Sequence, residues 1–200
     1  MNLTKCTILF LLYLVFMVLH HFNLDHLETK SEKFYQKTEN YKKVQDLLHD
    51  VLPHVDYLNY APDFLLILVF AYMALMNYKL IYHFGGLVFS LILLRQLIIQ
   101  ITVLPKNDMC KIKTHTSIFR GGCYDKIFSG HFGIGFLMTL ILYDNGLINK
   151  VSAVFINFLN ALFILLTRSH YTIDIVVSIF AVIIIYQNNL NICNLLNKHF

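Results

Sequence analysis

Charged side chains are scarce in this sequence. Of its 200 residues, 14% are Asp, Glu, Lys or Arg, whereas 57% are hydrophobic and the mean hydropathy is +0.59. Such a composition is far too apolar for an ordinary soluble domain, and a bilayer is the solvent that accepts apolar surface on all sides. The net charge of +4 is modest, and the lysines lie in connecting segments. Nucleic-acid binding therefore has little support, and we expect membrane lipids as partners.

Cysteine is also rare, and its spacing excludes one common kind of metal site. The four cysteines, Cys6, Cys110, Cys123 and Cys193, form no Cys-x-x-Cys pair. A zinc site of that type is therefore absent. Cys110 and Cys123 fall in one connecting segment, where they could form a disulfide in an oxidising lumen or remain two free thiols. No acidic cluster accompanies the histidines, so we expect no metal site.

Apolar runs bounded by polar turns predict an all-α integral membrane protein with six spanning helices in a single bundle. A spanning helix needs roughly 20 residues. We place the spans at residues 6–19, 64–82, 84–104, 127–143, 147–167 and 171–187. Gly85 and Gly86 would connect the second span to the third, and the Asp-Asn-Gly sequence at 144–146 would connect the fourth to the fifth. We expect one domain over residues 1–200, with the first span in 1–22, a polar loop in 23–63 and the catalytic helical core in 64–187.

The first apolar run could instead be a signal peptide, with Lys5 as its basic flank. No small-residue cleavage site follows it, however, and we expect a retained span. In the polar loop, "VQDLLHDVLPHVD" places Leu47, Leu48, Val51 and Leu52 at helical spacing. This pattern predicts a short amphipathic helix that lies on the membrane surface.

Two histidines stand at the starts of apolar segments on the same side of the predicted bundle. His131 follows Ser129 and Gly130 in "FSGHFGIGF", and His170 precedes Asp174 in "SHYTID". Asp174 lies one helical turn after His170, so its carboxylate can accept a hydrogen bond from one ring nitrogen and leave the other basic. Ser129 is a typical N-cap, and a helix start with glycine suits an anion such as phosphate. The pattern indicates phosphoryl transfer, in which one histidine attacks phosphorus and the other protonates the leaving oxygen.

Arg95 interrupts the third predicted span, in "SLILLRQLIIQ". An arginine at the centre of a membrane costs ~2.5–3.5 kcal/mol on insertion scales, so its side chain should face a polar cavity or a partner. We expect a phosphate headgroup there; a structural ion pair with Asp174 or another acid is the alternative. Asp125 and Tyr171, close to the two histidines, are further candidates to contact the substrate. Six histidines lack such neighbours and are expected at the surface or the membrane interface: His20, His21, His54, His83, His115 and His199.

Four segments resemble, in order, the motifs of the sphingomyelin synthase family within the lipid phosphate phosphatase superfamily. "CYDKIFSGH" and "HYTIDIVVS" are similar to its two signature blocks. "QDLLHDVLPH" is similar to its Leu-Pro-Asp segment, and "LLRQLIIQITVLPKND" to its arginine-containing third span. Together the segments extend over residues 45–186. The ordered set is more specific than a lone Ser-Gly-His.

The resemblance implies a six-span enzyme that moves a phosphate-bearing headgroup from a phospholipid, such as phosphatidylcholine or phosphatidylethanolamine, to ceramide and releases diacylglycerol. It implies His170 as the nucleophile, Asp174 as the acid that supports it, and His131 as the histidine that handles the leaving and entering hydroxyls. It implies no metal or soluble cofactor. It also implies a Golgi, endoplasmic reticulum or plasma membrane protein with its active site on the lumenal or exterior side.

Departures from the family pattern leave the headgroup and the acceptor open. Phe132 stands where the family has threonine, and Tyr124 where it has glycine. In the Leu-Pro-Asp segment, Val44 and Gln45 stand in place of the leucine and the proline. The arginine at position 168 is closer to inositolphosphorylceramide-type enzymes. A lipid phosphate phosphatase would use the same histidines with water as acceptor, although its usual Lys-x6-Arg-Pro block is not visible. A diacylglycerol cholinephosphotransferase and a catalytically inactive lipid-binding membrane protein are also compatible with these motifs. The oligomeric state is open.

Loop charge points to the opposite orientation. The positive-inside rule would place the loops after the first, third and fifth spans in the cytosol. These loops carry Lys30, Lys33, Lys37, Lys42, Lys43, Lys106, Lys111, Lys113, Arg120, Lys126 and Arg168, whereas the other side carries Lys5, Lys79, Lys150 and Lys198. We give the four ordered motifs more weight, because loop charge is a statistical signal.

Overall fold

The computed structural model describes residues 15, 18, 22, 26, 27, 29–35, 44–102, 105, 124 and 126–199, and for 189–199 it describes the backbone alone. These residues form helices and turns, and no strand occurs among them. The assigned elements are α2 (Leu47–Val51), the 3-10 helix η1 (Asp56–Leu58), α3 (Ala61–Met76), α4 (Lys79–Ile101), α5 (Gly130–Asp144), α6 (Lys150–Leu166) and α7 (Thr172–His199). The prediction of an all-helical chain is therefore confirmed for the part that the structure describes.

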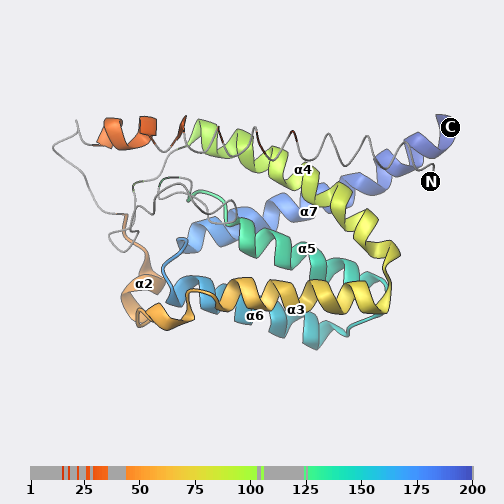
Figure 1. The fold of residues 1–200 in the computed structure, drawn as a ribbon, viewed down its shortest axis with the longest axis horizontal. Helices are drawn as coiled ribbons and strands as arrows, with labels where there is room; N and C mark the ends of the chain where they lie inside the picture. The colour runs from red at the N-terminus through yellow and green to blue at the C-terminus, as the bar shows by residue number, and fades with distance from the viewer. Residues whose placement is uncertain are drawn as a thin grey trace.

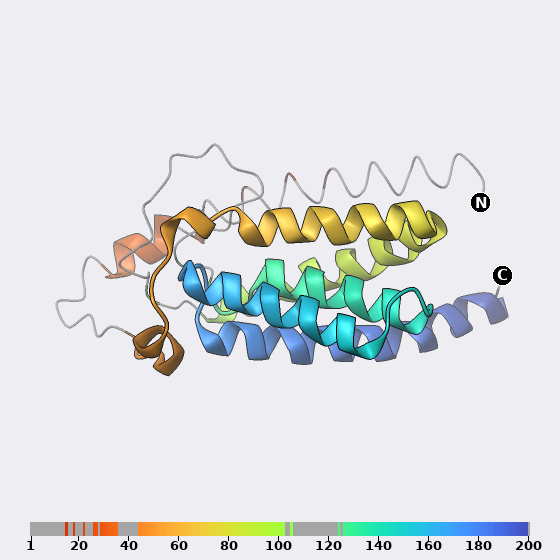
Figure 2. The same ribbon diagram turned by 90° about the horizontal axis from the view of Figure 1, so that it is seen from below.

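Helices α3 to α7 run back and forth along the long axis of a bundle (Figure 1). Helices α3, α5 and α7 begin at the end of the bundle where α2 lies, and α4 and α6 end there. In the view of Figure 2, α3 and α7 lie on opposite sides of α5 and α6. This up-and-down order brings the first turns of three helices to one end of the molecule.

Helix α5 is the centre of the bundle, because it packs against α3, α4, α6 and α7. Its buried side chains Leu137, Met138 and Ile141 join one hydrophobic core with residues of the other helices. The core also contains buried side chains of α3, α4 and α7: Val69, Met73, Leu87, Leu91 and Val182.

Gly135 lets α5 approach two neighbours closely. A β-carbon built at Gly135 would lie 2.6 Å from Nδ2 of Asn160 in α6 and 2.9 Å from Cδ2 of Leu66 in α3. No side chain fits at such distances without displacing its neighbours. The small residue therefore permits the close helix packing that is common between apolar helices.

The chain turns between α3 and α4 at Asn77 and Tyr78, so the prediction of a turn at Gly85 and Gly86 is wrong. Both glycines lie inside α4, and a β-carbon at either would meet no atom within 4 Å. At the observed turn, Oδ1 of Asn77 accepts a hydrogen bond from the backbone N–H of Lys79 at 3.2 Å. An asparagine side chain can replace a backbone partner that is missing at a helix start, and this contact favours the turn there.

The predicted Asp-Asn-Gly turn is confirmed. Helix α5 ends at Asp144, and Gly146 has a φ angle of +67°. This left-handed conformation is one that glycine adopts at no steric cost.

Two helical segments are long and apolar enough to cross a membrane, judged by length and composition: Asp56–Met76 and Lys79–Ile101. The segments Gly130–Asp144, Lys150–Leu166 and Thr172–Asn188 are shorter apolar helices. The six-span arrangement therefore stays a prediction. Its first span, at residues 6–19, lies outside the described residues except for two positions.

Large apolar side chains are exposed along the outer helices. Examples are Phe64 and Ile67 on α3, and Val154 and Phe158 on α6. Extended exposed apolar surface is typical of a face that lipid or a partner covers. This surface and the two long apolar helices agree with a membrane protein.

Helix α2 forms within the predicted amphipathic segment and is only five residues long. Leu47 and Val51 are about four-fifths exposed, at 81% and 80%. The side chain that α2 buries is the polar His49. The helix thus presents apolar side chains outward and a polar one toward the bundle.

Candidate active site

His170 lies in the turn before α7, and Asp174 lies in the first turn of that helix. Oδ2 of Asp174 accepts a hydrogen bond from the backbone N–H of Tyr171 at 2.8 Å and lies 3.3 Å from Nδ1 of His170. The first contact is one half of a capping box, in which an acid in the first turn satisfies an N–H group at the helix start. The helix cap therefore fixes the carboxylate beside the histidine ring.

The surroundings of His170 select one tautomer of its ring. Nδ1 lies 3.0 Å from the carbonyl oxygen of Lys126, in addition to its contact with Asp174. Both neighbours are acceptors, so Nδ1 donates the proton and Nε2 carries the lone pair. His170 is 8% exposed and Asp174 is fully buried. The ring is thus held in the form in which Nε2 can act as a nucleophile.

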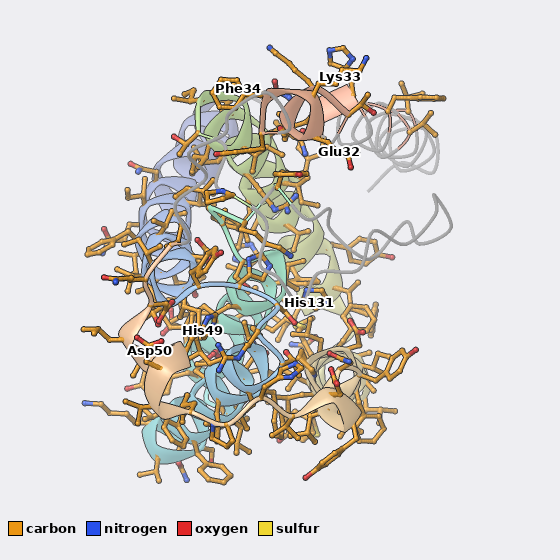
Figure 3. All side chains as sticks on the ribbon, turned by 90° about the vertical axis from the view of Figure 1, so that its left-hand side faces the viewer. Glu32, Lys33, Phe34, His49, Asp50 and His131 are labelled. Carbon is orange, nitrogen blue, oxygen red and sulfur yellow. The ribbon has the colours of Figure 1, made fainter. Side chains whose placement is uncertain are left out.

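His131, in the first turn of α5, is paired with a second carboxylate. Its Nε2 lies 2.6 Å from Oδ1 of Asp63, which belongs to the first turn of α3. Both side chains are partly exposed. Figure 3 looks at this end of the bundle and labels His131. A histidine that is hydrogen-bonded to a carboxylate and open to its surroundings can accept and donate protons.

The two histidines make no hydrogen bond with each other in the described structure. Each keeps its own acid: Asp174 for His170 and Asp63 for His131. Asp63 is not predicted from the sequence. The signal that could have found it is a lone acid, after Pro62, at the start of a strongly apolar helix.

Ser178 connects the start of α5, which carries His131, with the start of α7, which carries Asp174. Ser129 is the N-cap of α5, and its side-chain oxygen accepts a hydrogen bond from Phe132 N–H at 3.3 Å. The backbone N–H of Ser129 donates to Oγ of Ser178 at 3.0 Å. The Ser178 hydroxyl lies 2.7 Å from the carbonyl oxygen of Asp174 and 3.0 Å from that of Ser129. Ser178, which the sequence patterns did not single out, therefore holds the start of α5 against the first turns of α7.

Arg95 lies beside the start of α5. Its Nε donates a hydrogen bond to the carbonyl oxygen of Phe128 at 3.4 Å, and its side chain is buried. A β-carbon at Gly130 would lie 3.7 Å from the same nitrogen. The Asp174 carboxylate pairs with His170 and not with Arg95, and an ion pair of Arg95 with another acid stays a prediction. The guanidinium thus lies at the helix start where a phosphate was expected.

Two buried oxygens near the histidines have no hydrogen-bond partner in the described structure: Oδ1 of Asp174 and Oδ1 of Asn160. Asn160, from α6, donates through Nδ2 to the carbonyl oxygen of His131 at 3.3 Å. Most buried polar atoms are hydrogen-bonded, and a buried acceptor without a partner costs free energy. The end of the bundle that carries the histidines therefore holds buried polar atoms beside the apolar core.

The remaining predicted site residues differ in position. Asp125 lies outside the described residues. Tyr171 is buried, and its hydroxyl donates to the carbonyl oxygen of Pro105 at 3.4 Å. Its backbone N–H, as described above, belongs to the cap around Asp174. The structure thus gives Tyr171 a supporting position in the turn.

Among the residues that the structure describes, no group of three or more His, Cys, Asp and Glu side chains could hold a metal ion. Cys110 and Cys123, for which a disulfide and two free thiols are both compatible with the sequence, lie outside this set.

Residues 122–190 match the family model for the PAP2 superfamily C-terminal domain. This stretch is PAP2-like. The match supports placement in the lipid phosphate phosphatase superfamily, whose members are phosphatases or phosphotransferases that act on lipid phosphates. The PAP2-like stretch contains His131, His170 and Asp174, together with the linking Ser178. A search of curated proteins finds no match to this chain.

Proposed function

We propose that the protein is a membrane phosphotransferase that moves a phosphocholine-type headgroup from a phospholipid to ceramide. The observation that carries the proposal is the pair of histidines in the PAP2-like stretch, each hydrogen-bonded to a separate carboxylate. The sphingomyelin synthase motifs support ceramide as the acceptor and phosphatidylcholine or phosphatidylethanolamine as the donor.

In the first step, Nε2 of His170 attacks the donor phosphorus. A nitrogen–phosphorus bond forms, and the bond from phosphorus to the diacylglycerol oxygen breaks. His131 gives its proton to that oxygen, so diacylglycerol leaves as an alcohol. Asp174 stabilises the positive charge that develops on His170, and Asp63 holds His131 in place.

In the second step, His131 takes the proton from the primary hydroxyl of ceramide. The hydroxyl oxygen attacks phosphorus, the nitrogen–phosphorus bond breaks, and His170 regains its lone pair. The N–H groups at the start of α5 and the Arg95 guanidinium hold the non-bridging oxygens in both steps, as backbone donors and cations do for developing anions.

A lipid phosphate phosphatase is the second candidate, because the PAP2-like match applies equally to phosphatases. In that reaction the substrate is a lipid phosphate monoester. His170 attacks its phosphorus and diacylglycerol leaves, and water takes the place of ceramide in the second step, so that inorganic phosphate is released. A transferase that uses diacylglycerol as its acceptor would keep the same catalytic residues and would differ only in the pocket that binds the acceptor.

The test supplies purified protein in proteoliposomes with headgroup-labelled phosphatidylcholine or phosphatidylethanolamine, and with ceramide, diacylglycerol or no acceptor. We expect label in a sphingolipid only when ceramide is present. Free phosphocholine or phosphoethanolamine without acceptor would instead show that water is the acceptor, and release of inorganic phosphate from labelled phosphatidic acid would assign a lipid phosphate phosphatase. The absence of turnover with any phospholipid, or full activity in His170→Ala, would refute the enzyme as proposed.

Four variants assign the roles of the residues. His170→Ala and Asp174→Asn are expected to impair both steps. His131→Ala should slow transfer by about 10²–10⁴-fold, the usual contribution of a general acid–base group, and Asp63→Asn should slow it by at most as much. Asp56→Asn is the matched control for Asp63→Asn, because Asp56 is also at a helix start but pairs with the partly exposed His54. Equal loss in the control would remove Asp63 from the mechanism.

We further propose a multi-pass protein of the Golgi, endoplasmic reticulum or plasma membrane, with the histidines on the lumenal or exterior side. The two long apolar helices and the PAP2-like stretch support the membrane setting.

A further inference from the structure

The short helix α2 makes polar contacts with the turn that carries His170. Asp46 is the N-cap of α2, and its Oδ1 accepts from the backbone N–H groups of Leu48 at 3.1 Å and His49 at 3.4 Å. The same carboxylate reaches Thr172, 126 residues along the chain. Oδ2 accepts from Thr172 N–H at 2.5 Å, and Oδ1 accepts from the Thr172 hydroxyl at 2.7 Å. One buried carboxylate thus caps both α2 and α7.

His49 holds the other side of the same turn. Its Nε2 lies 3.1 Å from the carbonyl oxygen of His170, which can only accept, so Nε2 donates the hydrogen. The His49 ring packs on the Tyr171 ring with centroids 5.6 Å apart. Together, Asp46 and His49 hold the backbone immediately before and immediately after Tyr171.

Two more contacts fasten the same segments together. Nη2 of Arg168 donates to the carbonyl oxygens of His49 at 2.6 Å and of Leu52 at 3.4 Å. The backbone N–H of Val55 donates to the carbonyl oxygen of Leu166 at 2.9 Å. Arg168 has a φ angle of +51°, a conformation that non-glycine residues keep only where their surroundings hold them.

Core packing accounts for only one end of α2, where its C-cap Leu52 packs against the core cluster of Phe132, Ile164, Leu165 and Ile175. A helix of five residues is not stable alone. Its apolar Leu47 and Val51 are exposed, whereas its buried contacts are those of Asp46 and His49 with the turn. Figure 3 labels His49 on the inner side of this helix and Asp50 beside it. Within the helix itself, the buried side chain is therefore that of His49, and it contacts the backbone of the turn.

We propose that α2 is a clamp that positions the His170 imidazole, with Asp46 and His49 as positioning residues. They act through the backbone on both sides of Tyr171 and touch no reacting atom. Asp174 and Lys126 fix the ring of His170, and the clamp fixes the backbone from which that ring extends. Misplacement of a reacting group by about 1 Å can reduce a rate 10²-fold, which makes such a clamp important for turnover.

The state of Asp46 agrees with this role. Burial raises the pKa of the Asp46 carboxyl, but the two hydrogen bonds from Thr172 and the neighbouring His49 outweigh burial, and the pKa lies below its usual value. The carboxylate therefore remains ionised at neutral pH and keeps both acceptor oxygens.

The test compares variants that remove one contact each. Asp46→Asn removes the charge and one acceptor oxygen. His49→Phe keeps a ring against Tyr171 but removes the donor, and His49→Gln keeps a donor but removes the ring. Asp50→Asn and His54→Gln are the matched controls, because Asp50 is exposed on the same helix and His54 contacts Asp56 outside the turn.

Two measurements are made on each variant, and only the first rests on the proposed function. The first is kcat and KM of headgroup transfer in proteoliposomes. The second is hydrogen exchange of the Thr172 amide, followed by mass spectrometry of peptides that contain residues 166–175. Asp46→Asn and His49→Phe should lower kcat about 10- to 100-fold with little change in KM, and should accelerate exchange. His49→Gln and both controls should resemble the wild type.

Each outcome decides the proposal. Unchanged kcat in Asp46→Asn and His49→Phe would overturn the positioning role. Equal loss of kcat in His49→Gln and His49→Phe would overturn the role of the His49 donor. Unchanged Thr172 exchange in Asp46→Asn would overturn the clamp itself. If the wild-type protein transfers no headgroup, the proposed function fails, and the exchange measurement alone decides whether the clamp exists.

Discussion

At the scale of single residues, the two histidine–carboxylate pairs differ in their surroundings. Asp174 is fully buried and receives a backbone N–H as well as the His170 ring. Asp63 and His131 are both partly exposed. A buried carboxylate with two hydrogen bonds suits a histidine that must keep one tautomer. A partly exposed histidine–carboxylate pair suits a histidine that exchanges protons with alcohols. The geometry agrees with the division of roles in the proposed mechanism.

His49 leads to a prediction about pH. Burial lowers the pKa of the His49 imidazole, the Asp46 and Asp174 carboxylates raise it, Arg168 lowers it, and the net shift is downward. The unfolded chain therefore binds this proton more readily than the folded chain. The contribution of the neutral His49 imidazole to the free energy of unfolding is therefore fully present above about pH 6.5. It is lost as the pH falls through the lowered pKa of this imidazole.

The measurement is the thermal unfolding midpoint in detergent between pH 8 and pH 5. We expect the midpoint of the wild type to fall more steeply on acidification than that of His49→Gln. His54→Gln should keep the steep wild-type dependence. Identical curves for the wild type and His49→Gln would show that other groups cause the acid sensitivity.

At the scale of elements, α5 determines the position of the site. Its first turn carries His131 beside the N-cap Ser129, and its middle packs against α3 and α6 at Gly135. The same packing brings Asp63 of α3 to His131 and Asn160 of α6 to the His131 carbonyl. Close helix approach at one glycine is thus coupled to the geometry of the proton-transfer pair.

Gly135→Ala is expected to destabilise the bundle, and Gly85→Ala is its matched control. The added methyl group at residue 135 would displace Asn160 and Leu66, and overpacking of this kind costs about 1–3 kcal/mol. At residue 85 the surroundings are open, and alanine favours a helix by about 0.5–1 kcal/mol over glycine. Thermal unfolding in detergent should show a lower midpoint for the first variant and an equal or higher one for the second. The reverse order would contradict the packing described for α5.

At the scale of the whole molecule, the candidate site lies at one end of the bundle. The first turns of α3, α5 and α7, the turn before α7 and the short α2 all meet there. If the bundle spans a membrane, one end faces each aqueous side, and the chemistry is confined to one of them. The sequence motifs and the loop charges disagree about which side that is.

A glycosylation acceptor decides the orientation. We expect an Asn-x-Thr site inserted between residues 106 and 121, in the connection from α4 to α5, to be modified in cells, because that connection leads to the site end and glycosylation takes place in the lumen. The same insertion in the connection at 145–149, at the opposite end, is the control and should stay unmodified. Modification of the second site alone would place the histidines in the cytosol.

Features that depend on neighbouring residues follow from the sequence alone. Apolar composition predicts helices throughout, the Asp-Asn-Gly sequence predicts the turn after α5, and the four-residue spacing of His170 and Asp174 brings an imidazole and a carboxylate together at the start of α7. The misplaced turn at Gly85 and Gly86 is the local failure. Glycine alone does not end a helix when the apolar segment continues beyond it. The chain turns instead at Asn77, whose side chain accepts a hydrogen bond from the backbone N–H of Lys79.

Only the tertiary structure decided the partners that are distant in sequence. Asp63 and His131 are 68 residues apart, Ser129 and Ser178 are 49 apart, and Asp46 and Thr172 are 126 apart. Helical periodicity reports which residues share a face within a turn or two, and it carries no information about which helix packs against that face. The sequence by itself therefore determined the helices and the His170–Asp174 pair. The packing of α3 and α7 on α5, and of α2 on the turn before α7, decided the second carboxylate and the support of the site, because these contacts exist only once the helices have packed.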